Sequence, residues 1–216
     1  MGLTIERFAK VRPFLYHLTA AGNIASLRAT RCLEPTAALR DRAKSGTFAP
    51  TRRLRPEVIE VDGRSIHIRD QNPLHAGSIA FEDGWDLNRL VAHIDSHVFF
   101  WPGTARGPVE YGLNHYGAYA DEGPSLLRMP LASVLTENPT AVPLFSAYNS
   151  GSPRMRNGRS SPRGPRTYLP VEDFERSSDD VGEVVFASRI LLPSDVEVAE
   201  DYAGPWAPLF GSGPSQ

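Results

Sequence analysis

The residues that could carry chemistry form short polar and aromatic motifs scattered along the chain. In chain order they are a strand that ends in Tyr16-His17-Leu18-Thr19, an Arg69-Asp70-Gln71 run, the aromatic Phe99-Phe100-Trp101, and Glu183 before an apolar strand. Gathered in one cleft, these residue types are what cleavage of a nicotinamide–ribose bond requires. That bond breaks through an oxocarbenium-like state, similar to that of glycoside hydrolysis.

Each residue type has a definite part in such a reaction. A carboxylate near the ribose, here Glu183, stabilises the positive charge that develops there. His17 can hydrogen-bond a ribose hydroxyl, an aromatic ring can stack on nicotinamide, and Arg69 can hold a diphosphate through two parallel hydrogen bonds. Taken singly, each has a more ordinary role: a satisfied strand-end histidine, a core ring, a surface ion pair or an exposed strand start. Their order along the chain is what favours function.

A basic segment precedes the strand that begins with Glu183. It holds five arginines within thirteen residues, interleaved with Gly, Pro, Ser and Asn: Arg154, Arg156, Arg159, Arg163 and Arg166. Because such a composition cannot bury a core, we expect the segment to be exposed. It could follow a phosphate backbone and so bind nucleic acid. The alternative is a solvated loop whose arginines reflect codon usage.

A pair of histidines, His93 and His97, has the i, i+4 spacing that could hold a metal on one helix face. The zincin pattern needs Glu directly after the first His, and Ile94 stands there, so we expect surface histidines near a helix end. The sequence has no Gly-x-Ser-x-Gly elbow, no P-loop and no dinucleotide fingerprint. Cys32 is the only cysteine, which excludes an internal disulfide and a four-Cys zinc site.

The composition is that of a globular protein, and with a single cysteine we expect it in the reducing cytoplasm. The chain has 216 residues, 41% of them hydrophobic, and a formal net charge of −2, so the whole molecule is not a polycation. No apolar run approaches the ~20 residues that span a bilayer, and the first residues lack a signal-peptide pattern. We therefore expect no membrane association.

The hydrophobic pattern predicts an α+β fold. Strands are expected over 14–18, 98–101 (stopped by Pro102), 126–129, 142–148 and 184–190, and a hairpin over 58–61 and 65–69 across Asp62-Gly63. Helices are expected over 23–31, 36–44, 85–95 and 110–119. Residues 45–56 form a polar connection, 149–182 a long irregular stretch and 211–216 a tail. Loops as long as 149–182 are usually functional or disordered.

Together these motifs resemble the ADP-ribosyltransferase superfamily, in particular the DarT-type toxins that ADP-ribosylate nucleobases. The family's His-x-Thr strand and the helix after it are similar to His17, Thr19 and Asn23 with its following residues. Arg69 and 98–101 hold the places of the family's Arg and aromatic strand, and Glu183 that of its catalytic Glu. The chain also resembles a bacterial family with similar Tyr-His-Leu-Thr, Arg-Asp-Gln and Phe-Phe-Trp-Pro motifs.

The resemblance implies two packed antiparallel sheets around an NAD cleft with flanking helices. It implies one domain over residues 1–216 with a core of about 12–192, and no metal. The activity implied is transfer of ADP-ribose from NAD to a macromolecular acceptor, most often a nucleic-acid base, by a toxin or defence protein that an antitoxin could restrain. The implied catalytic residues are Glu183, Arg69 and His17. The implied NAD-binding residues are Tyr16, His17, Leu18, Thr19, Asn23, Arg69, Phe99, Phe100, Trp101, Asn149 and Ser150.

Three other functions remain open at this point. The same fold could serve an RNA 2′-phosphotransferase-like reaction. The chain could be a module that binds nucleic acid through its basic segment, or an enzyme-like protein that binds NAD without turnover. A Glu183→Ala variant separates the transferase from the binding module, because only the transferase depends on that carboxylate.

Overall fold

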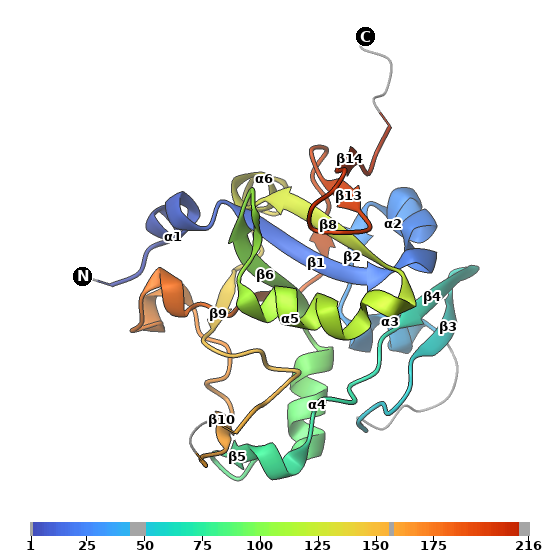
Figure 1. Cartoon of the computed structure of the whole chain (residues 1–216). Helices are drawn as coiled ribbons and strands as arrows, with labels where there is room; N and C mark the ends of the chain where they lie inside the picture. Colours follow the sequence, from blue (N-terminus) through green and yellow to red (C-terminus); the bar gives the residue numbers. More distant parts are fainter. Residues whose placement is uncertain (1, 44–50, 156–157, 212–216) are drawn as a thin grey trace.

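The computed structural model describes residues 2–43, 51–155 and 158–211. Its centre is an antiparallel sheet in the order β14-β13-β8-β1-β6-β11-β9, with β7 paired to β6 (Figure 1). The strands are β1 (Phe14–Ala20), β6 (Val98–Thr104), β7 (Gly107–Pro108), β8 (Pro124–Pro130), β9 (Leu144–Ser146), β11 (Glu183–Phe186), β13 (Glu197–Ala199) and β14 (Ala207–Pro208). The predicted α+β class with antiparallel strands is confirmed.

Three two-stranded ribbons stand apart from this sheet. They are the β3 (Glu57–Val61) and β4 (Arg64–Ile68) hairpin, the antiparallel pair β2 (Cys32–Leu33) with β12 (Ile190–Leu191), and the parallel pair β5 (Ile79–Phe81) with β10 (Ser161–Arg163). The predicted hairpin is confirmed. Its two turn residues have positive φ, 50° at Asp62 and 75° at Gly63, as a two-residue turn between twisted strands requires.

Six α-helices surround the sheet in the described ranges: α1 (Ile5–Val11), α2 (Ile24–Thr30), α3 (Thr36–Arg42), α4 (Leu87–Asp95), α5 (Glu110–Tyr119) and α6 (Leu131–Glu137). Five short 3-10 turns complete the elements: η1 (Ala21–Asn23), η2 (Ala76–Ser78), η3 (Ala120–Glu122), η4 (Val171–Asp173) and η5 (Ser178–Asp180). The four predicted helices form, the last residue of the one expected over 36–44 lying outside the described ranges, and α1 and α6 were not predicted. No helix in those ranges is both long and apolar enough to cross a bilayer.

Both faces of the sheet are packed. One face holds the largest core cluster, in which Leu15, Phe100 and Phe186 are fully buried. The other face holds Tyr16 and Trp101 with their aromatic neighbours. Helix α4 buries Leu90, Val91 and Ile94 against residues next to and within β5, below the sheet in Figure 1. Successive side chains of β1 and β6 point to opposite faces of the sheet, so Leu15 and Phe100 pack on one face and Tyr16 and Trp101 on the other.

Three expectations about strands were wrong. Pro102 does not stop β6, which runs to Thr104, because the proline's carbonyl still accepts a hydrogen bond from Val109 N (2.9 Å) and the strand pairs onward with β7. The strand expected over 184–190 is two strands, since β12 leaves the sheet to pair with β2. Residues 149–182 are not uniformly irregular, because they contain β10 and bury Tyr168 and Phe174.

Candidate functional site

The order of the sheet brings the three chemistry-bearing strands side by side. β1 lies next to β6, with Tyr16 opposite Trp101, and β6 lies next to β11, with Phe100 opposite Val184. His17, the aromatic run and Glu183 therefore come from three adjacent strands although 166 positions, 17 to 183, separate the outer two. This adjacency could not be derived from the sequence alone.

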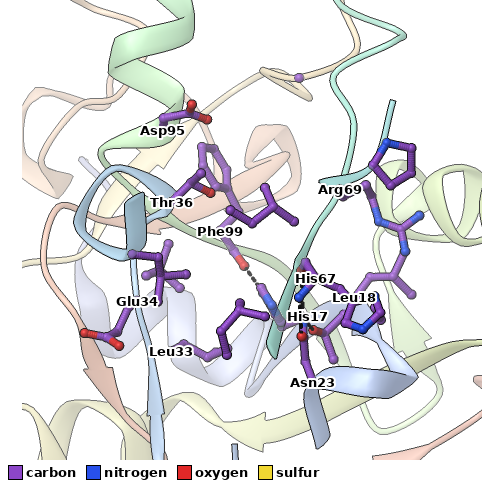
Figure 2. A pocket seen from close by; sticks show the side chains of 18 of the residues that line it. His17, Leu18, Asn23, Leu33, Glu34, Thr36, His67, Arg69, Asp95 and Phe99 are labelled. Carbon is purple, nitrogen blue, oxygen red and sulfur yellow. Dashed lines mark hydrogen bonds between the residues drawn. The ribbon is translucent and has the colours of Figure 1, made fainter. Parts of the chain in front are cut away.

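A cavity of about 440 Å³ opens where these strands meet α2, α3, α4 and the β3–β4 hairpin (Figure 2). Nine of the residues expected to bind NAD or act in catalysis line it: His17, Leu18, Thr19, Asn23, Arg69, Phe99, Trp101, Asn149 and Glu183. Tyr16, Phe100 and Ser150 are not among its lining residues. Tyr16 instead packs against Tyr202 and Trp206, and Phe100 against Phe186, so both belong to the core.

Glu183 is buried rather than exposed at its strand start, with 3% of its surface accessible. Its Oε2 accepts a hydrogen bond from Ser150 N (3.1 Å) and another from the Ser150 hydroxyl. Burial raises the pKa of Glu183 to about 7, although the two Ser150 bonds and the nearby Arg163 act in the opposite direction. A carboxyl with a pKa near neutrality is well placed to accept a proton at physiological pH.

His17 is oriented by the neighbouring strand. Its Nδ1 lies 2.8 Å from the carbonyl oxygen of Phe99, so Nδ1 carries the proton and donates it (Figure 2). Burial lowers the pKa of His17. The imidazole is therefore neutral near pH 7, and its Nε2 is left as a hydrogen-bond acceptor.

Asn23 holds the wall of the cavity together. Its Nδ2 donates to Thr19 Oγ1 (3.0 Å) and to His67 O (2.9 Å), and its Oδ1 accepts from His67 N (2.8 Å). Gly22 lies beside the His67 ring, where a Cβ would come to 2.7 Å from His67 Nε2 in the observed rotamer. Asn23 and Thr19 thus tie strand β4 to the end of β1, which gives both a positioning role at the cavity.

Arg69 lies at the edge of the cavity on an aromatic stack. Its guanidinium sits 4.0 Å above the ring of Tyr119, and its Nη1 is 3.5 Å from Glu122 Oε2. The ring of Tyr119 contacts that of His115 in a tilted arrangement, with centroids 4.9 Å apart, and the pKa of His115 is lowered to about 4 by burial and by Arg69. The ion pair with Glu122 is long and half-exposed, so it holds the guanidinium only weakly. Arg69 is therefore available to an anion.

A buried network beside the cavity escaped the sequence analysis. Arg53 makes two hydrogen bonds to Asp95, Nη1–Oδ2 at 2.5 Å and Nη2–Oδ1 at 2.9 Å, and both residues are 7% exposed. Gln71 Nε2 donates to Asp95 Oδ1 (3.0 Å), and Arg53 Nε to the carbonyl of Arg69 (3.0 Å). All three side chains line the cavity. The sequence offered little to predict this ion pair, because Arg53 lies in a polar connection and Asp95 is 42 positions away.

The basic segment is divided in two by burial. Arg154, Arg159 and Arg166 are exposed, as expected, and Arg156 lies outside the described residues. The expectation was wrong for Arg163, which is 1% exposed. Its two terminal nitrogens donate to Asn149 O (2.9 Å), Ser161 Oγ (2.7 Å) and Pro162 O (2.8 Å), while its buried Nε has no hydrogen-bond partner among the described residues. A buried side chain is not placed to touch a phosphate backbone.

His93, in the last turn of α4, and His97, just beyond its C-cap, also differ from their expected surface position. His97 is 7% exposed and its Nδ1 lies 2.8 Å from His93 O. The ring of His93 stacks on Tyr168 at 4.7 Å, and burial lowers the pKa of His93 to about 4. In the ranges that the structure describes, no three His, Cys, Asp or Glu side chains are grouped to hold a metal.

Comparison with known proteins gives one match. The model of a family described as a family of unknown function (DUF7002) matches residues 13–196, which is most of the chain and includes every residue that lines the cavity. No curated protein and no solved structure matches the chain. Any activity must therefore be argued from the cavity itself.

Proposed function

We propose that this chain, which belongs to the family of unknown function DUF7002, is an ADP-ribosyltransferase that moves ADP-ribose from NAD to a base of a nucleic acid. The observation that carries the proposal is the meeting of His17, the aromatic strand and a buried Glu183 in one cavity, through the adjacent strands β1, β6 and β11. Motifs chosen from the sequence for one reaction would not be expected to converge if each were merely structural.

The make-up of the cavity suits NAD as the substrate. Its volume of about 440 Å³ lies in the usual range for small-molecule sites, and aromatic walls with a few polar groups are typical of them. Phe99 or Trp101 would stack on nicotinamide. Arg69 would bind the diphosphate, and the acceptor Nε2 of His17 would take a hydrogen bond from a ribose hydroxyl. We assign the two-sheet architecture of the resembled superfamily as part of this proposal.

Glu183 would carry the chemistry. In the transfer, the bond between ribose C1′ and the ring nitrogen of nicotinamide breaks, and nicotinamide leaves with the electron pair. A nitrogen of the acceptor base forms the new bond to C1′ and gives its proton to the carboxylate of Glu183. The same carboxylate stabilises the positive charge on the ribose in between. Its pKa of about 7 leaves a substantial ionised fraction at neutral pH.

The acceptor would approach from the loop before β11. Arg154, Arg159 and Arg166 are exposed there and could contact its phosphates. A protein acceptor would not need this concentration of exposed arginines, so the basic segment favours nucleic acid.

The test is a transfer assay with labelled NAD. The purified protein is incubated with single-stranded DNA, with total RNA and with lysate protein, and both label incorporation and nicotinamide release are measured. Glu183→Gln keeps the size of the side chain and removes its charge, and the exposed Glu200→Gln is the matched control. We expect the wild type and Glu200→Gln to label a nucleic acid and Glu183→Gln to lose at least about 100-fold in rate.

Three results would refute the proposal in different ways. Equal labelling by wild type and Glu183→Gln would remove Glu183 from the reaction. Label in protein alone would refute the acceptor class. Nucleic-acid binding without label or nicotinamide release, equal in both proteins, would indicate a binding module.

A further inference from the structure

The segment of residues 148–150 connects the acceptor-side loop with the carboxylate of Glu183. Ser150 supplies both hydrogen bonds to Glu183, from its backbone N and its hydroxyl, and is itself fully buried. The residue before it, Asn149, offers its carbonyl oxygen to the guanidinium of Arg163 at 2.9 Å. Tyr148 lies with its ring 4.6 Å from the Arg163 guanidinium. Arg163 thus touches both residues that precede Ser150.

Arg163 is in turn fixed from the far side. It belongs to β10, which runs parallel to β5, and its carbonyl oxygen accepts a hydrogen bond from Glu82 N at 2.9 Å. The remaining side-chain bonds go to Ser161 Oγ and Pro162 O. All of these partners are neutral oxygens, so the strongest opposite charge that acts on the guanidinium is that of Glu183.

A buried guanidinium without a carboxylate in contact is a costly feature for a loop. The desolvation of such a charge is several kcal/mol, and an apolar side chain of similar size would avoid it. The cost is understandable if the charge and the geometry serve the neighbouring carboxylate. Resting on the proposed function, we propose that Arg163 is a positioning residue, which holds the 148–150 segment so that Ser150 keeps one oxygen of Glu183 engaged and the other free for substrate.

The first test measures Glu183 directly and needs no catalysis. In protein labelled with ¹³C at the Glu side-chain carboxyl, the resonance of Glu183 is assigned by its absence from Glu183→Gln and followed against pH. The ionisable groups around it are Arg163 from β10 and Tyr168 from the same loop, with the Ser150 hydroxyl as a hydrogen-bond donor. Arg163→Met should raise the pKa of Glu183 above its wild-type value, because it removes the positive charge of the guanidinium and weakens the hydrogen bonds from Ser150 to Glu183. The control Arg106→Met, at an exposed turn, should leave it unchanged.

Arg163→Lys separates positioning from charge. Lysine keeps the charge but cannot bind Asn149 O, Ser161 Oγ and Pro162 O in the same fork. It should therefore raise the pKa of Glu183 in the wild-type background and raise it less in a Ser150→Ala background. If Arg163→Met does not fold, as judged by its circular dichroism and thermal melting, the comparison of Arg163→Lys in the wild-type and Ser150→Ala backgrounds decides alone. Equal pKa shifts in both backgrounds, or none in either, overturn the proposal.

The second test is steady-state release of nicotinamide from NAD. A misplaced carboxylate should lower kcat by about 10–100-fold with the KM for NAD unchanged. A smaller folded fraction would also lower the apparent kcat without changing KM, so kcat is referred to the folded fraction measured by circular dichroism. If the wild type releases no nicotinamide, the proposed function fails, and the titration of Glu183 still decides whether Arg163 positions it.

Discussion

The ion pair between Arg53 and Asp95 allows a stability prediction that follows directly from its geometry. Asp95→Ala removes two bonds to Arg53 and one to Gln71 while leaving the guanidinium buried. Breaking a buried pair by removing one partner costs about 3–5 kcal/mol, chiefly through the uncompensated charge. A typical domain has a free energy of unfolding of about 5–15 kcal/mol. We therefore expect Asp95→Ala to lose at least about a fifth of its free energy of unfolding.

Urea denaturation followed by tryptophan fluorescence measures this loss. With an m-value of about 2–3 kcal/mol/M, the urea midpoint should fall by roughly 1–2.5 M. Asp121→Ala, at an exposed carboxylate, is the matched control and should move the midpoint little. The double variant Arg53→Met with Asp95→Leu removes both charges and should be more stable than Asp95→Ala, because no buried charge is left alone. A loss below about 1 kcal/mol in Asp95→Ala, or a double variant less stable than it, would refute the reasoning.

Three further predictions concern the cavity wall and Glu183. Asn23→Ala leaves the amide and carbonyl of His67 without their partners, so it should cost about 1–3 kcal/mol and raise the KM for NAD. Gly22→Ala brings a Cβ to 2.7 Å from His67 Nε2, but that atom ends an exposed side chain that can rotate away, so the stability in urea denaturation should change by less than about 1 kcal/mol. The native state holds the proton of Glu183 up to a pKa of about 7, above the ordinary 4.5. The unfolded state therefore binds fewer protons in that window, and this carboxyl makes stability fall as pH rises from about 4.5 to 7. His115, with its pKa lowered to about 4 from 6.5, acts in the opposite sense from pH 4 to 6.5. The measurement is therefore the difference in unfolding free energy between wild type and Glu183→Gln. The wild type should lose stability relative to Glu183→Gln above about pH 4.5, and the difference should shrink as the pH is lowered toward 4.5.

Secondary structure was predictable from the sequence where it depends on residues that are close together in the chain. The Asp62-Gly63 turn predicts its hairpin because two adjacent positive φ values are acceptable only to such residues. Helix α4 was predicted because its apolar positions repeat at the helical period. In the structure Asp86 also caps its first turn, accepting from Arg89 N at 2.8 Å. The parallel pairing of β10 with β5 could not be found, because it joins two three-residue strands that are more than 75 positions apart.

The residue types of the candidate site were predictable from the sequence, but the residues that hold them in position were not. Nine of the expected residues line the cavity, since types such as Glu183 and His17 were chosen for what their side chains can do. The positioning residues act through backbone groups instead. Asn23 hydrogen-bonds the backbone of His67 in the hairpin, and Arg163 hydrogen-bonds carbonyl oxygens of its loop. A backbone partner leaves no trace in the sequence, because any residue type can provide it.

The basic segment illustrates the consequence for function. Composition treats its arginines as equivalent, and a solvated loop and a nucleic-acid contact are the only alternatives that composition offers. The structure separates Arg163, buried among neutral oxygens near Glu183, from Arg154, Arg159 and Arg166 on the surface. Two arginines of one segment, Arg163 and Arg166, can thus serve opposite ends of the same proposed reaction. In the proposed reaction, the buried Arg163 would position the carboxylate of Glu183, and the exposed Arg166 would contact the acceptor.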